Sequence, residues 1–76
     1  MKYEMAKHLA GYELDCTFVD HECLASAHEG YALLLEEVHE LWEEVRRKPN
    51  SRSKVRMAAE CKQIAALAMR FMIDLC

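Results

Sequence analysis

The sequence contains little of what interrupts a helix: two glycines and one proline in 76 residues. This scarcity excludes a β-sandwich, a collagen-like repeat and a disordered linker. No apolar run approaches the ~20 residues that a membrane-spanning helix requires. The N-terminal residues also lack the apolar core and cleavage site of a secretory signal. We therefore expect a cytoplasmic protein that does not enter the membrane and whose four cysteines are reduced.

Basic residues are also few: the chain has 10 Lys and Arg against 13 Asp and Glu, which gives a net charge of −3. No basic cluster is large enough to neutralise a duplex backbone, which argues against general nucleic-acid binding. Apolar residues, by contrast, make up 53% of the chain. A single domain of this size buries only about 60% of its unfolded surface. This apolar surplus predicts a homo-oligomer.

Two long helices are predicted, one over residues 26–48 and one over residues 53–76. Ser26 and Glu29 form a capping box at the start of the first helix, and Pro49 ends that helix. Its apolar residues recur every three or four positions and are predicted to face the core: Ala27, Tyr31, Leu34, Leu35, Val38, Leu41, Trp42 and Val45. The second helix is apolar around most of its circumference, so Cys61 and Cys76 are predicted to be small core residues.

Residues 1–25 predict a third, N-terminal helix that Gly11 ends or weakens, followed by an irregular connection over residues 15–25. The chain is therefore predicted to be a single all-α domain, residues 1–76. An antiparallel helical hairpin is joined by the N-terminal helix, and oligomerisation completes the bundle.

Carboxylates on the two long helices are the strongest candidates for a site. Glu37 and Glu40 lie on one shoulder of the first helix, and Glu60 lies on the apolar stripe of the second. A buried carboxylate must be neutralised, paired or bound to a metal. The acidic run is either a solvated face or part of a site. Glu60 on the second helix also has two alternatives. It either forms an ion pair with an arginine or meets Glu37 and Glu40 around a hard cation such as Mg²⁺.

A second stripe on the last helix supports a site on the same side. It steps by three or four residues through Arg56, Glu60, Gln63, Leu67, Arg70 and Asp74. Arginines beside a carboxylate and an amide fit a phosphate-bearing ligand next to a metal. Ordinary surface salt bridges explain the spacing nearly as well.

The residues around these carboxylates resemble a known family. Glu36-Glu37-Val38-His39-Glu40-Leu41, followed after a turn by Glu60-Cys61-Lys62-Gln63, is similar to the MazG-like all-α nucleotide pyrophosphohydrolases, in particular the small ones of phages and prophages. The resemblance covers about residues 26–75. It rests on a Glu-x-x-Glu motif on one helix and the start of a Glu-x-x-Asp motif on the next.

The resemblance implies a Mg²⁺-dependent enzyme, with Mn²⁺ as an alternative metal, that cleaves nucleoside triphosphates to monophosphate and pyrophosphate. It also implies active sites built from bundles of two or four subunits. Glu37, Glu40 and Glu60 would be the catalytic residues and, together with Gln63, the metal ligands. Lys54, Arg56 and Arg70 are the candidates for holding phosphate.

Gln63 stands where the family motif has Asp, and its amide brings neither negative charge nor a base. The alternative is therefore a noncatalytic descendant of the same scaffold, which sequesters a nucleotide or binds and inhibits a host protein. A zinc site at Cys16, His21, Cys23 and His28 matches no strong zinc spacing. Separate structural roles for these four residues are favoured.

Overall fold

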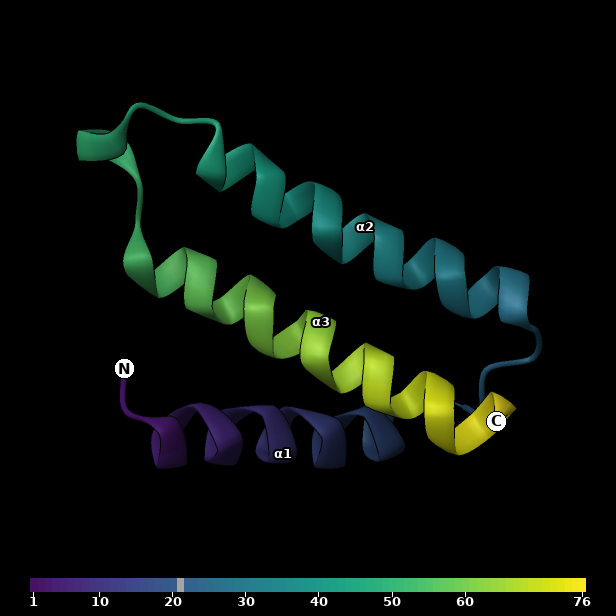
Figure 1. Cartoon of the computed structure of the whole chain (residues 1–76). Coiled ribbons are helices and arrows are strands. Elements are labelled where there is room, and N and C mark those ends of the chain that lie inside the picture. The colour runs from purple at the N-terminus through teal and green to yellow at the C-terminus, as the bar shows by residue number, and fades with distance from the viewer. Residues whose placement is uncertain (21) are drawn as a thin grey trace.

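The computed structural model describes residues 1–20 and 22–76 of the chain. These residues form the helices α1 (Tyr3–Asp20), α2 (Ala27–Val45) and α3 (Lys54–Leu75), with a short 3₁₀ turn, Pro49–Ser51, between the last two. The predicted all-α class is thereby confirmed for the described residues. Helix α3 lies in the middle of a single layer, with α1 along one side and α2 along the other (Figure 1). Helix α2 runs antiparallel to α3, as the predicted hairpin requires.

Both long helices begin directly after a serine whose side chain caps the first turn. The Ser26 Oγ accepts a hydrogen bond from the backbone N–H of Glu29 at 3.1 Å, and Ser53 Oγ accepts one from Arg56 at 3.1 Å. Each bond satisfies a backbone donor that the first helical turn leaves without a partner. Helix α2 ends at Val45, three residues before the predicted end at residue 48.

The prediction for residues 15–25 was wrong in its first part, because α1 continues through Gly11 and reaches Asp20. Glycine inside a helix costs only about 0.5–1 kcal/mol relative to alanine, and contacts with another helix can outweigh that cost. Those contacts lie beyond Gly11: the backbone carbonyl and hydroxyl of Thr17 bind Arg70 of α3, whose guanidinium covers the Phe18 ring.

The face of α2 that meets α3 also differs from the prediction. The residues of α2 that face α3 lie to one side of the centre of the predicted apolar stripe. They are Gly30, Leu34, Glu37, Leu41 and Glu44. Tyr31 and Trp42, predicted to be core, remain 63% and 56% exposed.

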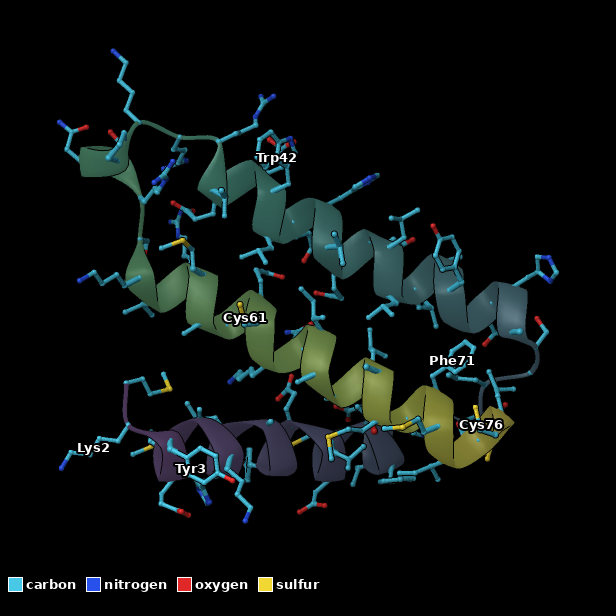
Figure 2. All side chains as sticks on the ribbon, viewed as in Figure 1. Lys2, Tyr3, Trp42, Cys61, Phe71 and Cys76 are labelled. Atoms are coloured by element: carbon cyan, nitrogen blue, oxygen red, sulfur yellow. The ribbon has the colours of Figure 1, made fainter. Side chains whose placement is uncertain are left out.

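Contacts at the two ends of α2 set this rotation. The Phe71 side chain lies between α3 and α2 (Figure 2), and a Cβ on Gly30 would lie 2.6 Å from its ring. At the other end, Glu44 accepts a hydrogen bond from the backbone N–H of Ser53 at 2.9 Å. On α3, Cys61 and Cys76 are likewise exposed and not in the core.

We expect alanine to have opposite effects at the two glycines. A Cβ at Gly30 lies 2.6 Å and 2.9 Å from Phe71 Cδ2 and Cε2, so Gly30→Ala forces α2 and α3 apart. It should lower the free energy of unfolding by about 1–3 kcal/mol, as overpacking typically does. A Cβ at Gly11 meets no atom of the described residues within 4 Å. Gly11→Ala should therefore raise the free energy of unfolding by up to about 1 kcal/mol. Urea denaturation of both variants measures the difference, and equal effects would contradict the close approach at Gly30.

A buried ion pair joins α1, the connection before α2, and α3. Arg70 is 3% exposed, and its Nε donates to Asp74 Oδ2 at 2.8 Å. The same Asp74 oxygen accepts the backbone N–H of Leu24 at 2.8 Å, while Arg70 Nη1 donates to the carbonyl of Thr17 at 2.9 Å. Leu24 and Ala66 are the buried apolar residues of the described chain. This polar network therefore holds together a fold with little apolar core.

Candidate metal and ligand site

Three carboxylates from two helices converge in the middle of the hairpin. Glu37 and Glu40 are one helical turn apart on α2, and Glu60 faces them from α3. Each offers one carboxylate oxygen, and these three oxygens lie within 4.8 Å of one another. The sequence left open whether Glu60 pairs with an arginine or meets Glu37 and Glu40, and the structure places it with these two carboxylates. We call these three residues the carboxylate triad.

The triad is electrostatically strained when all three groups are ionised. Burial raises the pKa of Glu37 from 4.5 to about 7, and hydrogen bonding with Glu60 and repulsion from Glu40 add to this rise. Burial also raises the pKa of Glu60, to which hydrogen bonding and repulsion from Glu40 contribute. Such a cluster needs either a proton or a cation between its oxygens at neutral pH.

Glu60 carries the clearest sign of an unmet interaction. Its Oε2 is buried and has no hydrogen-bond partner among the described residues. Gln63, one turn further along α3, binds the triad instead of adding charge to it. With its amide nitrogen turned toward Glu37, it donates to both carboxylate oxygens at 3.1–3.2 Å. Gln63 would have to turn its carbonyl oxygen inward to serve as a metal ligand.

A cavity of about 460 Å³ adjoins the triad on one side of the layer. Residues of α3 contribute Gln63, Ala66, Leu67 and Arg70 to its lining, and α1, α2 and the connection between them supply the rest. Six carboxylates line the cavity: Glu13, Asp20, Glu22, Glu29, Glu36 and Glu37. The only basic residue among the described lining is Arg70, and its guanidinium is engaged by Asp74, Thr17 and Phe18. The cavity therefore favours a cation, or an anion already neutralised by one.

The three candidates for holding phosphate are not brought together. Arg70 lines the cavity but is held in the buried ion pair. Arg56 lies one turn before Glu60, borders a second hollow with Glu40, and approaches Glu44 at 3.9 Å. Lys54 is exposed in the first turn of α3. Of the three, Arg56 has the most accessible guanidinium close to the triad.

Sequence analysis assigned no role to Glu44, which lies near this site. Glu44 is 6% exposed and binds the backbone of Ser53, so it holds the turn between α2 and α3. Its spacing from Glu37 and Glu40 placed it on the same side of the helix, but nothing in the neighbouring sequence distinguished it from them.

Cys16 and Cys23 line the cavity as free thiols. His21, the third member of the weak zinc pattern, lies outside the described residues.

Comparison with protein-family models, with curated proteins and with solved structures found no match to this chain. Within residues 1–20 and 22–76, no helix has both the length and the apolar character needed to cross a membrane. A functional proposal therefore depends on the residues and geometry of the site itself.

Proposed function

We propose that this chain is a MazG-like, Mg²⁺-dependent pyrophosphohydrolase that converts a nucleoside triphosphate to its monophosphate and pyrophosphate. The observation that carries the proposal is the carboxylate triad, with the partnerless Oε2 of Glu60 inside it. The resemblance of residues 26–75 to that family supplies the reaction.

The triad residues fit the metal that this reaction requires. All three donors are carboxylate oxygens, which suit Mg²⁺ or Mn²⁺ and do not favour a soft metal. Glu37, Glu40 and Glu60 would hold the ion, and the carbonyl oxygen of Gln63 could join them. When bound, the ion supplies positive charge to the phosphates and lowers the pKa of bound water.

The acidic cavity restricts the form in which a triphosphate can bind. Six lining carboxylates repel a bare polyphosphate, so the substrate enters with its charge offset by a divalent cation. Glu37 and Gln63 belong to both the cavity lining and the triad region, so phosphates bound in the cavity would lie beside the proposed metal ligands. Arg56, one turn before Glu60 and outside the cavity lining, is the exposed guanidinium that we propose contacts a phosphate. Water then adds to phosphorus at the α–β linkage, and pyrophosphate leaves.

Pyrophosphate release from a panel of nucleoside triphosphates with Mg²⁺ tests this proposal. We expect release from at least one triphosphate, and Glu60→Gln should reduce kcat/KM by about 100-fold or more, because it removes a metal-binding charge. Glu43→Gln is the matched control, since Glu43 is exposed and, among the described residues, pairs with the exposed Arg46 at 3.3 Å. Absence of release from every triphosphate, with unchanged Mg²⁺ binding in Glu60→Gln, would refute the enzyme proposal.

The contact between Gln63 and Glu37 supports a second candidate function. An amide at this position adds no negative charge to the metal site and cannot accept a proton as a base. A noncatalytic protein that sequesters a nucleotide, or binds and inhibits a host protein, has no need of that charge. Nucleotide binding without turnover, or capture of a host protein that Glu60→Gln still binds, would select this alternative.

A further inference from the structure

Positive charge is concentrated at one end of the molecule, where the chain turns from α2 to α3. Residues 45–59 contain no Asp or Glu, while the remaining four basic residues of the chain stand among thirteen acidic ones. The basic residues of this segment are all exposed: Arg46, Arg47, Lys48, Arg52, Lys54 and Arg56. We call these six residues the basic end. The net charge of −3 therefore conceals a separation between an acidic body and a basic end.

Contacts within the turn hold several of the basic side chains in place. Glu44 is buried, and its two carboxylate oxygens lie 3.9 Å from the guanidiniums of Arg47 and Arg56, one oxygen to each. Arg52 Nε donates to the backbone carbonyl of Val45 at 2.7 Å, which places a third guanidinium at the end of α2. One buried carboxylate thus draws together two arginines whose side chains remain 50% and 68% exposed. The basic end therefore presents positive charge to solvent in a defined arrangement.

An exposed tryptophan lies beside these arginines. Trp42 is 56% exposed and lies at the hairpin end of α2 (Figure 2). It lines the second hollow, whose volume is about 670 Å³. The basic residues of this hollow are Arg46, Arg47 and Arg56, and its acidic residues are Glu40, Glu43 and Glu44. The hollow thus combines a flat aromatic surface with guanidinium donors and carboxylate acceptors.

We propose that the basic end and Trp42 bind a short single strand of nucleic acid, with its phosphates on the basic residues and one base stacked on the indole ring. Stacking on an exposed aromatic side chain accepts any base, and a guanidinium binds phosphate through paired N–H donors. Six positive charges are too few to neutralise the long backbone of a duplex, but they match the few phosphates of a strand that covers one end of this molecule. This inference does not depend on nucleotide hydrolysis.

The carboxylates of the hollow favour a nucleobase over an acidic peptide. Three glutamates line the hollow beside Trp42, and they would repel the carboxylates of an acidic peptide at the point of closest contact. A nucleobase carries no charge, and its amino groups donate hydrogen bonds that a glutamate accepts. The phosphates of the same strand would lie outside the hollow, on Lys48, Arg52 and Lys54. The distribution of charge at this end therefore suits a ligand that is anionic along its backbone and neutral at its bases.

Tryptophan fluorescence of the unmodified chain tests the proposal, because Trp42 is the single tryptophan of the sequence. We expect a single strand of about eight nucleotides without a terminal triphosphate to quench this fluorescence. The titration is made in EDTA, so that no divalent cation occupies the carboxylate triad. The logarithm of the binding constant should fall with the logarithm of the salt concentration with a slope of roughly −2 to −4, as about three to six phosphate contacts give. An acidic peptide of equal charge should neither bind nor quench.

Variants separate the contribution of stacking from that of charge, and fluorescence anisotropy of a labelled strand measures their binding. Trp42→Ala should weaken binding by about 10-fold, whereas Trp42→Tyr keeps an aromatic surface and should weaken it far less. Tyr31→Ala removes a similarly exposed aromatic side chain near the other end of α2 and is the matched control. Lys48→Gln should make the salt slope shallower by about 0.7, while Lys7→Gln on α1 should leave it unchanged.

Several results would overturn the proposal. They are binding that leaves the Trp42 fluorescence unchanged, equal effects of Trp42→Ala and Tyr31→Ala, and absence of binding at low ionic strength. An acidic peptide or a nucleoside monophosphate that binds as tightly as the strand would overturn it as well, because neither combines a base with a run of phosphates. None of these results bears on pyrophosphate release with Mg²⁺, which tests the hydrolase proposal separately.

Discussion

Arg70→Met is expected to lower the free energy of unfolding by about 3–5 kcal/mol, the usual cost of removing one partner from a buried ion pair. The substitution leaves the carboxylate of Asp74, whose side chain is also 3% exposed, with the backbone N–H of Leu24 but without its cationic partner. It also removes the bonds to Thr17 that hold α1 against α3. Because small domains have a stability of only about 5–15 kcal/mol, we expect a substantial part of the population to lose the docking of α1 or to unfold.

Chemical denaturation monitored by circular dichroism measures this loss. Arg46→Met is the matched control: it breaks an exposed ion pair with Glu43 and should cost no more than about 1 kcal/mol. The double variant Arg70→Met/Asp74→Leu should lose less than the sum of its two single variants, since neither then leaves a buried charge behind. Equal losses in Arg70→Met and Arg46→Met would show that the buried network does not hold the fold together.

Without a divalent cation, the fold is expected to become less stable as pH rises from about 4.5 to 7. The pKa of Glu37 is 4.5 in its ordinary state and about 7 in the folded chain, so the folded state binds more protons in this window. Stability therefore falls with rising pH, and the penalty is complete above pH 7. The pKa of Glu60 is also raised and contributes in the same direction. Because Glu37 is partly exposed, solvent screening limits its share to about 1–2 kcal/mol.

Mg²⁺ should reverse this trend by taking the place of the proton. The ion binds ionised carboxylates, so millimolar Mg²⁺ is expected to stabilise the fold at pH 8 and to have little effect at pH 5. Thermal denaturation with and without Mg²⁺ across this range provides the measurement. Glu37→Gln removes the titrating group and should flatten the pH dependence, whereas Glu43→Gln should not. A pH dependence that is identical in the unmodified chain and Glu37→Gln would contradict the assignment to the triad.

Features set by interactions between residues close in the sequence could be predicted from the sequence, whereas features set by contacts between distant residues could not. The starts of α2 and α3 were predictable because Ser26 and Ser53 each bind a backbone N–H three residues away. The convergence of Glu37, Glu40 and Glu60 was one of two alternatives that the sequence left open, since helical periodicity and a short hairpin turn allow these positions to meet. The docking of α1 was not predictable, because it depends on Arg70 reaching Thr17 across 53 residues.

The sequence by itself determined that this protein is helical, where its long helices begin, and that Glu37, Glu40 and Glu60 lie on helix faces where they are able to meet. All three follow from capping and periodicity, which act over a few residues. Tertiary structure decided how α2 is rotated: Gly30 packs on Phe71, Glu44 binds Ser53, and Tyr31 and Trp42 are left exposed. Helical periodicity identifies an apolar stripe but not its partner, because that choice depends on side-chain contacts between helices. The same contacts decided that Arg70 is held in a buried ion pair.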